Sequence, residues 1–325
     1  MVGEAIRTVA VLSPGDMGHA VGQVLREHGL RVITCLRDRS ERSRRLAAQA
    51  GIEDVAEEQA LVREADVLLA VLPPARAHGL AQRIAAALRA TGADLLYVDC
   101  NAVAPQAVRA IAGELEAAGA RCVDAGIIGG PPRPGRGESG RHRDTETRGR
   151  GAMEGQGRLA PEGPKFYASG EHAAEFARLR DYGLDVRVIG EAIGQASGLK
   201  MCYGALTKGV TALATELLVA GEALGLGETL RSELRSSQGG MVEWLSRSVP
   251  GMPPKAYRWA GEMEEIAATF GALGLTPKMF EGAADVYRFV EGTELGKETP
   301  ETRQRGQTLE EVVQVLASSL PQTER

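Results

Sequence analysis

The first 125 residues alternate short apolar runs with segments of helical period, and this alternation restricts the possible folds more than any other feature. The apolar runs predict strands at residues 8–12, 31–36, 66–72, 95–99 and 121–125. Helical patterns lie at about 16–28, 40–50, 57–64, 75–90 and 103–118. Each run is continuously apolar, as in strands buried on both faces, so the alternation predicts a doubly wound parallel sheet.

The remainder of the chain changes to an almost purely helical pattern. Strands are predicted once more at 165–169 and 185–189, around a helix near 171–182. Residues 196–224 predict one long helix, apolar nearly all round, which implies burial by other helices. Further helices are predicted near 228–247, 254–273, 276–291 and 307–319. The predicted fold is therefore α/β, with a doubly wound Rossmann domain over 1–193 and an all-helical domain over 194–325.

Residues 131–164 interrupt the first predicted domain and contain almost no apolar side chains. They are dense in Gly, Arg and Pro, so burial cannot offset the entropy lost on ordering them. We interpret this segment as a disordered insertion. The alternative is an arginine-rich arm for phosphate or nucleic acid, although acidic residues within the segment dilute its positive charge.

Composition excludes several classes of partner. The chain has 325 residues and a net charge of −5, which gives no overall attraction to nucleic acid or to an acidic membrane. No run approaches the about 20 apolar residues of a membrane span, and the first residues lack the features of a signal peptide. The cysteines lack C-x-x-C spacing, which predicts reduced, buried thiols in a cytoplasmic protein. They are Cys35, Cys100, Cys122 and Cys202.

A glycine-containing turn joins the first predicted strand to the first predicted helix. The turn consists of Ser13, Pro14, Gly15, Asp16, Met17 and Gly18. A G-x-G-x-x-G pattern in this strand–turn–helix context indicates dinucleotide binding, because glycines let the backbone approach a pyrophosphate at the helix N-terminus. Ser13 replaces the first glycine of that pattern. The alternative is an ordinary strand–helix turn.

The residues after the second predicted strand favour NADP(H) over NAD(H). Arg37, Arg39, Ser40 and Arg42 follow this strand, where NAD-binding proteins often have a carboxylate. Guanidinium and hydroxyl groups suit a ribose 2′-phosphate, which arginine binds strongly. The alternative is a solvated helix start with Ser40 as its N-cap.

Polar and cleft-forming residues also follow two other predicted strands. Leu72 and Pro73 come after the strand at 66–72, and Asn101 comes after the strand at 95–99. Ligands of open parallel sheets bind at the carboxyl ends of the strands, so these residues are candidates for cofactor contacts. Such residues also commonly cap the next helix, and that alternative stays open.

Lys200 is the candidate catalytic residue, because it lies at the start of the long apolar helix. Apolar surroundings disfavour its charged form, which makes a lysine usable as an acid or base near neutral pH. Tyr203 and Thr207 follow one and two turns later on the same face. The alternative is a lysine whose charged end reaches solvent. The histidines have no metal-ligand spacing, so no metal site is predicted.

These positions together resemble the 6-phosphogluconate dehydrogenase-like, β-hydroxyacid dehydrogenase superfamily. Its G-x-G-x-M-G turn matches residues 13–18, and its G-x-x-G-x-x-K, with lysine as the acid/base, matches 194–200. Arg37 matches the family's NADP-marking arginine. The cofactor-side Leu-Pro and Ser or Asn match Leu72, Pro73 and Asn101. The resemblance also implies a homodimer formed through the helical domain.

Two departures from the family pattern concern the substrate. The family's D-x-P-x-S-G-G resembles residues 124–130, where Ile128 replaces a substrate-contacting serine before Gly129 and Gly130. Tyr203 replaces the asparagine of K-x-x-N. The resemblance therefore implies that Ile128, Gly129, Gly130 and Thr207 line a site for a less polar substrate, in a poorly characterised branch of the superfamily.

The sequence thus predicts an NADP(H)-dependent oxidoreductase acting on a small hydroxy or keto substrate. Lys200 is expected to be the general acid/base, with Tyr203 donating a hydrogen bond to the substrate. One alternative is an imine reductase, because related folds reduce C=N bonds and Ile128 suits an uncharged substrate. The other alternative is an NADP-binding protein without turnover.

Overall fold

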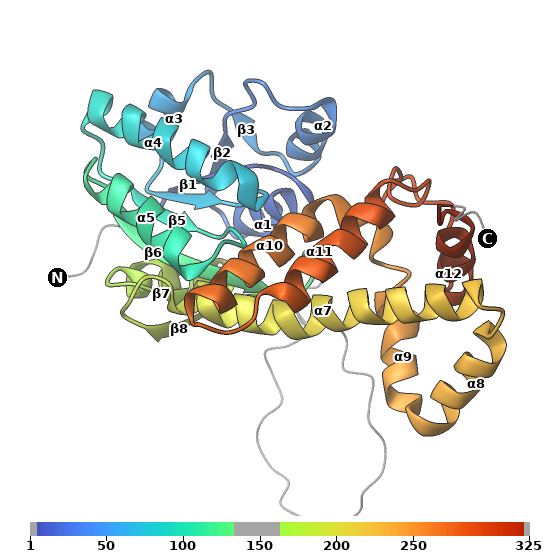
Figure 1. Cartoon of the computed structure of the whole chain (residues 1–325). Coiled ribbons are helices and arrows are strands. Elements are labelled where there is room, and N and C mark those ends of the chain that lie inside the picture. The colour runs from blue at the N-terminus through green and yellow to red at the C-terminus, as the bar shows by residue number, and fades with distance from the viewer. Residues whose placement is uncertain (1–4, 133–162, 322–325) are drawn as a thin grey trace, which may run out of the picture. The chain divides into compact units, whose positions relative to one another are not determined.

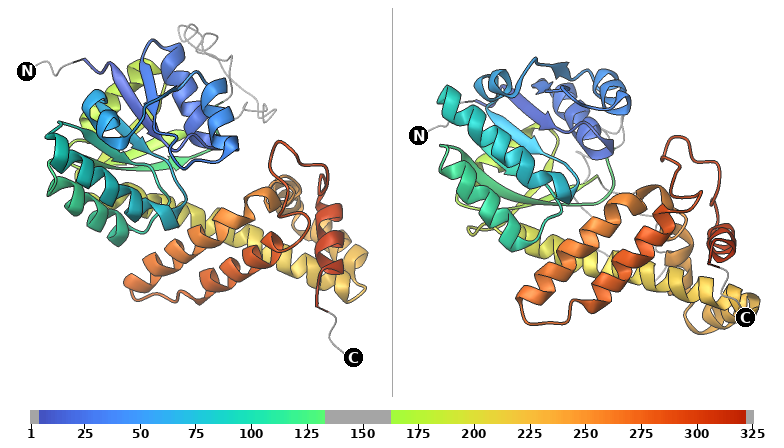
Figure 2. Two further views of the ribbon diagram at one scale, coloured as in Figure 1. Left: turned by 90° about the horizontal axis from the view of Figure 1, so that it is seen from above. Right: turned by 45° about the horizontal axis from the view of Figure 1, so that its top comes forward.

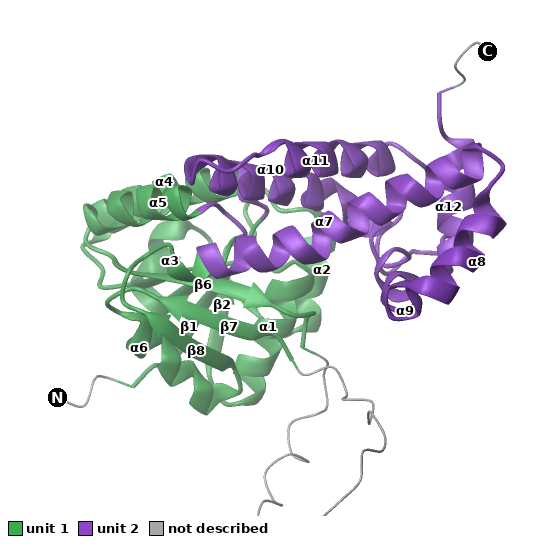
Figure 3. Ribbon diagram, turned by 60° about the horizontal axis from the view of Figure 1, so that its bottom comes forward, with its two compact units in different colours: residues 1–72, 76–101, 105–197 green, residues 73–75, 102–104, 198–325 purple. Residues whose placement is uncertain are grey.

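A computed structural model describes residues 5–132 and 163–321 of the chain. Most of the predicted insertion at 131–164 lies outside the described residues. The chain divides into two compact units (Figure 3). Unit 1 comprises 1–72, 76–101 and 105–197, and unit 2 comprises 73–75, 102–104 and 198–325.

In the described part of the chain, unit 1 contains an eight-stranded sheet in the order β3-β2-β1-β4-β5-β6-β7-β8 (Figure 1). The strands are β1 (Thr8–Leu12), β2 (Arg31–Thr34), β3 (Glu53–Asp54), β4 (Val67–Ala70), β5 (Leu96–Asp99), β6 (Arg121–Ile128), β7 (Lys165–Ser169) and β8 (Asp185–Gly190). The strand order reverses between β1 and β4, which are paired in parallel with Leu12 opposite Ala70. Such a reversal is where open α/β sheets bind ligands.

Helices connect these strands. They are α1 (Asp16–Glu27), α2 (Glu41–Gln49), α3 (Glu58–Glu64), η1 (Pro74–Arg76), α4 (Ala77–Thr91), α5 (Pro105–Glu116), α6 (Ala173–Phe176) and η2 (Ala177–Tyr182). Every residue of β1, β4 and β5 is buried, which confirms the prediction of strands covered on both faces. Val21 and Leu25 of α1 pack into the same core as Phe176 of α6.

One strand pairing differs from the fully parallel sheet that the sequence predicts. β7 runs antiparallel to β6 and parallel to β8. A parallel neighbour needs a crossover connection, usually a helix, whereas antiparallel strands do not. The sequence between β6 and β7 has no helical period, which agrees with the antiparallel pairing.

The regular elements in the described part of unit 2 are all helices. Its helices are α7 (Gln195–Ala223), α8 (Gly227–Ser237), α9 (Gly239–Ser248), η3 (Pro253–Lys255), α10 (Ala256–Ala272), α11 (Lys278–Glu291) and α12 (Leu309–Ser318). The single helix predicted at 228–247 is wrong, because α8 and α9 are separated at Gln238. Gly239 and Gly240 follow, and glycine weakens a helix interior.

The core of unit 2 forms where α10 and α11 pack side by side (Figure 2). The rings of Trp259 and Tyr287 meet edge to face, with their centroids 5.4 Å apart. Phe270 and Phe280 form a second aromatic pair at 4.5 Å. Aromatic pairs of this kind add about 0.5–1.5 kcal/mol beyond the apolar area that they bury.

Within one chain, helix α7 is covered on one side only. Met201 and Leu218 are buried, but Leu199, Leu206 and Leu213 are exposed. The Cys202 thiol of this helix is exposed, contrary to the prediction of buried thiols, whereas the other three cysteines are buried. None of the four forms a disulfide. Within the described residues, no helix is long and apolar enough to span a membrane.

Candidate active site

The turn between β1 and α1 has the geometry of an anion cradle. The N-cap Gly15 is extended and α1 has no side-chain cap, so the first amides of the helix are available to a ligand. A Cβ atom added to Gly15 would meet no atom within 4 Å, whereas one added to Gly18 would lie 2.2 Å from the Ser13 carbonyl oxygen. Gly15 therefore leaves open space above the turn, and Gly18 permits the close helix–strand approach.

Residues of α2 support the same turn. Arg42 forms an ion pair with Asp16, the first residue of α1. This pairing offsets a negative charge that would otherwise oppose an anion at the helix N-terminus. Ser40 is the N-cap of α2, and its hydroxyl accepts a 3.3 Å hydrogen bond from the Ser43 amide. The capping alternative for Ser40 is thus confirmed, and its contact with a cofactor stays a prediction.

Three arginines form a cluster beyond β2, consisting of Arg39, Arg76 and Arg83. Burial lowers the pKa of the Arg39 guanidinium, and the positive charges of Arg83 and Arg76 lower it further. Arg83 pairs with Glu58 at 2.8 Å. Among the described residues, no carboxylate forms an ion pair with Arg39 or Arg76, so the cluster has an excess of positive charge. Arg37 is exposed.

Asn101 presents an unpaired donor at the carboxyl end of β5. Its side chain is buried, and its Oδ1 accepts a 2.6 Å hydrogen bond from the Leu72 amide. Its Nδ2 has no hydrogen-bond partner among the described residues. A buried donor without a partner costs about 1–3 kcal/mol, which a ligand hydroxyl would recover. This orphaned amide, the open space at Gly15 and the uncapped α1 together fit a dinucleotide. Pro73, which follows Leu72, is exposed.

Asp124 anchors the start of α7, a role that the sequence did not reveal. Its buried carboxylate accepts hydrogen bonds from the amides of Gly194 and Ser197, at 2.9 and 3.0 Å. The hydroxyls of Ser197 and Ser169 donate to it at 2.7 and 3.2 Å. This carboxylate therefore caps the helix that carries Lys200, from a strand about 70 residues earlier in the chain.

The other residues of the predicted substrate motif lie at the end of β6. Ile128 is half-buried, and Gly129 and Gly130 are exposed. Gly129 has a φ of +121°, and a Cβ there would lie 3.1 Å from the Pro164 Cα. The backbone therefore requires glycine at this position, and substrate contact by these three residues stays a prediction.

Helix α7 carries the predicted catalytic residues in unit 2. Lys200 is half-buried and Tyr203 is 50% exposed. The Thr207 hydroxyl donates to the Tyr203 carbonyl oxygen at 3.1 Å, which is a bond within the helix. The cofactor-binding predictions other than Pro73 lie in unit 1, whereas Lys200, Tyr203 and Thr207 lie in unit 2.

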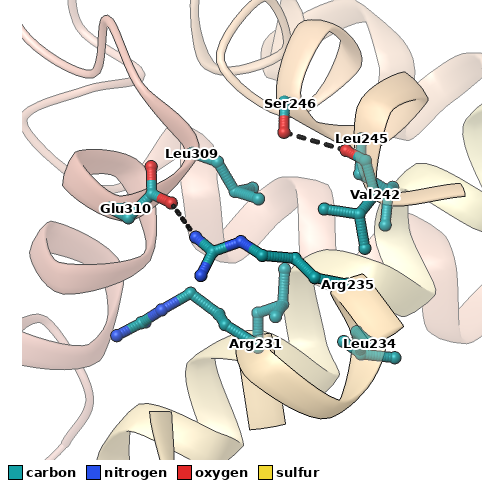
Figure 4. A pocket seen from close by; sticks show the side chains of 9 residues that line it. Arg231, Leu234, Arg235, Val242, Leu245, Ser246, Leu309 and Glu310 are labelled. Atoms are coloured by element: carbon teal, nitrogen blue, oxygen red, sulfur yellow. Dashed lines mark hydrogen bonds and ion pairs between the residues drawn. The ribbon is translucent and has the colours of Figure 1, made fainter. Parts of the chain in front are cut away.

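A pocket elsewhere in unit 2 contains none of the predicted site residues (Figure 4). Its lining is Leu218, Arg231, Leu234, Arg235, Val242, Leu245, Ser246, Leu309 and Glu310. Arg231 is paired with Glu222 at 3.0 Å, and Arg235 with Glu310 at 3.2 Å. Both cations are neutralised within the protein, so this pocket offers no free charge for chemistry. No cluster of metal-ligating side chains occurs among the described residues.

Two family models match separate parts of the chain. Residues 8–141 match the NAD binding domain of 6-phosphogluconate dehydrogenase. Residues 222–290 match a domain of unknown function (DUF1932). The first match contains the turn at 13–18 and Asn101. The second contains α10 with Glu262.

Several known proteins are similar over most of their length. An uncharacterized 28.5 kDa protein of Methanothermus fervidus is 24% identical over 278 residues, which cover 85% of this chain and 96% of that protein. A solved conserved protein of unknown function, described as structurally similar to 3-hydroxyacid dehydrogenases, is 27% identical with a TM-score of 0.59 and covers 87% of this chain and 96% of its own. The 3-hydroxyisobutyrate dehydrogenase of Salmonella typhimurium shares the fold at 17% identity and a TM-score of 0.64, over 95% of this chain and 99% of its own.

These similarities confirm the resemblance stated from the sequence. The turn, the orphaned amide of Asn101 and strands β1 to β6 occur within the part that matches an NAD-binding domain. The chain therefore joins a part that is similar to the NAD binding domain of 6-phosphogluconate dehydrogenase to a part that is similar to a domain of unknown function (DUF1932).

Proposed function

We propose that the protein is an NADP(H)-dependent dehydrogenase for a small hydroxy or keto substrate, with Lys200 as its general acid/base. The observation that carries this proposal is the half-buried Lys200 on α7, whose first turn is fixed by the buried carboxylate of Asp124. A lysine fixed in this way is suited to moving a proton at one substrate oxygen. When bound, the nicotinamide supplies the hydride acceptor or donor.

The residues of unit 1 would hold the cofactor. The backbone of the turn at 13–18 and the N-terminus of α1 would bind the pyrophosphate. Asn101 Nδ2 would donate to a ribose hydroxyl, which would satisfy its missing hydrogen bond. Arg37 and the arginine cluster would bind the 2′-phosphate.

The residues of α7 would act on the substrate. Neutral Lys200 would take the proton from a substrate hydroxyl during oxidation, and protonated Lys200 would give it to a carbonyl oxygen during reduction. Tyr203 would donate a hydrogen bond to the same oxygen or to a substrate carboxylate. Ile128 would present an apolar side chain, so the substrate is expected to be less polar than a typical small hydroxy acid.

A substrate panel tests this proposal against its two alternatives. NADPH consumption is measured with ketones, 2-keto and 3-keto acids, and cyclic imines, and the reverse reaction with the matching hydroxy compounds. Turnover of keto or hydroxy compounds supports the dehydrogenase. Turnover of cyclic imines alone would replace it with an imine reductase. Tight NADPH binding without any turnover would favour the non-catalytic protein.

We expect Arg39→Ala to weaken NADPH binding by about 10- to 100-fold and to leave NADH binding unchanged. The reason is that a hydrogen bond to a charged group contributes about 1.5–3 kcal/mol, and NADH lacks the 2′-phosphate. Fluorescence titration of both cofactors measures the two affinities. Arg37→Ala is the matched comparison, because the sequence predicts that Arg37 binds the ribose 2′-phosphate. If the wild type binds NADH more tightly than NADPH, the NADP preference is wrong.

The uncovered side of α7 supports the further proposal of a homodimer. An apolar stripe consists of Leu199, Tyr203, Leu206, Val210, Leu213 and Leu217. Its spacing alternates between four and three residues, which is the spacing that presents one seam to a second helix. Leu206 and Leu213 are 65% and 63% exposed. Two antiparallel copies of the stripe fit each other, because a pairing centred on Lys208 places Leu206 opposite Val210 and Tyr203 opposite Leu213.

Light scattering is therefore expected to give twice the mass of one chain. The double variant Leu206→Glu/Leu213→Glu should give the mass of one chain, because it places charges in the seam. The control is Leu273→Glu/Met279→Glu, which changes two side chains that are equally exposed but lie outside α7. A wild-type monomer, or equal dissociation in the control, would contradict the proposed interface.

A further inference from the structure

A buried carboxylate in unit 2 lies between two cations from different helices. The Glu262 side chain on α10 is only 7% exposed. Its Oε2 lies 3.0 Å from Lys208 Nζ of α7, and its Oε1 accepts a 2.9 Å hydrogen bond from Arg258 Nη1 of α10. We call Lys208, Arg258 and Glu262 the charge cluster. A buried charge is tolerated only when it is paired in this way.

The ammonium group of Lys208 is directed along α7 toward Lys200. Lys200, Gly204 and Lys208 are spaced four residues apart, so they follow one another on one side of the helix. A Cβ atom added to Gly204 would lie 3.4 Å from Lys208 Nζ and 3.2 Å from Ile266 Cδ1. Because Gly204 has no side chain, the Lys208 ammonium lies beside it, one turn nearer to Lys200 than its own Cα.

The positive charge of Lys200 also acts on Glu262. Burial raises the pKa of Glu262, but Lys208, Arg258 and Lys200 together lower it more, to about 2. Burial and the charge of Glu262 raise the pKa of Tyr287 on α11 above its usual range. The groups around the carboxylate are therefore two lysines of α7, one arginine of α10 and one phenol of α11.

We propose that Glu262 is a positioning residue for Lys200: it holds Lys208 and Arg258 and places one buried negative charge that favours the protonated form of Lys200. Lys208 and Arg258 act in the opposite direction, because they repel a second positive charge. Their pairing with Glu262 weakens that repulsion. The proposal rests on the proposed function, since it concerns the protonation of the lysine that would carry the proton.

Competitive labelling of lysines tests the proposal without a substrate or a cofactor. The protein is acetylated by a trace of acetic anhydride at a series of pH values, and mass spectrometry measures the modification rate of Lys200. Only the neutral amine reacts, so the midpoint of the rate profile reports the protonation of Lys200. In Glu262→Gln the midpoint is expected to fall by about one pH unit, which raises the rate of modification below the midpoint about tenfold.

The variant Lys208→Met tests whether the midpoint of Lys200 moves in the opposite direction when a positive charge is removed. Without this cation the negative charge of Glu262 is less compensated, and one positive charge that repels the Lys200 ammonium is gone. The midpoint of the Lys200 profile is therefore expected to rise. A merely structural role would shift both variants in the same direction. The matched control is Glu264→Gln, which removes an exposed carboxylate of α10 that pairs with Arg288; its Lys200 midpoint should equal that of the wild type.

The proposal is overturned if Glu262→Gln leaves the midpoint unchanged or raises it, or if both variants move together. Circular dichroism at each pH identifies a variant that has lost its fold, and Glu262→Asp, which keeps the charge, is then compared with Lys208→Met. If the proposal about Glu262 fails, activity is still expected to depend on Lys200. Failure of the proposed function would appear as full activity in a Lys200 variant, whatever the labelling shows.

Discussion

Replacement of Lys200 by alanine is expected to lower turnover by about 10²- to 10⁴-fold on any substrate that the panel identifies. This is the usual contribution of a positioned general acid or base. NADPH affinity should stay unchanged, because the predicted cofactor contacts lie elsewhere in the chain. Steady-state kinetics and fluorescence titration on the same preparation separate the two quantities.

Two further variants sharpen this result. Lys200→Arg keeps the positive charge but cannot give up its proton near neutral pH, so it should be as inactive as Lys200→Ala. Lys278→Ala, a change of another lysine at the first residue of α11, should retain wild-type activity. Full turnover by Lys200→Ala with intact cofactor binding would remove the catalytic role from this residue.

The second large effect is expected at Asp124. Asp124→Ala removes a buried acceptor of four hydrogen bonds and leaves the amides of Gly194 and Ser197 without a partner. The free energy of unfolding should fall by about 3–5 kcal/mol. For a unit of this size that corresponds to a decrease in Tm of roughly 10 °C, which differential scanning calorimetry measures.

Matched variants distinguish this anchor from a general loss of charge. Ser197→Ala removes one of the four hydrogen bonds and should cost about 1 kcal/mol. Asp185→Asn removes an exposed carboxylate that pairs with Arg187 and should change stability by less than about 0.5 kcal/mol. A Tm of Asp124→Ala within one or two degrees of the wild type would show that the carboxylate is not an anchor.

The fold followed from the sequence wherever one periodic segment makes one element. The apolar runs at 8–12 and 165–169 are strands over the same residues, and α10 and α11 begin within two residues of their predicted starts. The pairing direction of β7 was not predicted, because direction depends on the connection rather than on the strand's own residues. The break between α8 and α9 was not predicted, although Gly239 and Gly240 follow Gln238 at this point.

The site was predictable only in its local parts. The turn at 13–18 and Lys200 were candidates because each belongs to a motif formed by neighbouring residues in the sequence. Asp124, by contrast, acts on residues about 70 positions later, and Glu262 meets Lys208 from another helix. Arg39 joins Arg76 and Arg83 only through folding. A single sequence contains no signal for such pairs, because their proximity depends on the packing of separate elements.

The anchor of α7 determines where this chain can be recombined with a relative. Asp124, Ser169 and Ser197 all belong to unit 1, although Ser197 lies within the first turn of α7. A chimera joined between 197 and 198 inherits all three from one parent. The sequence pattern alone places the boundary between 193 and 194. A chimera joined there takes the Asp124 carboxylate from one parent and the Ser197 hydroxyl that donates to it from the other. Domain exchange among related chains should therefore place the junction after residue 197.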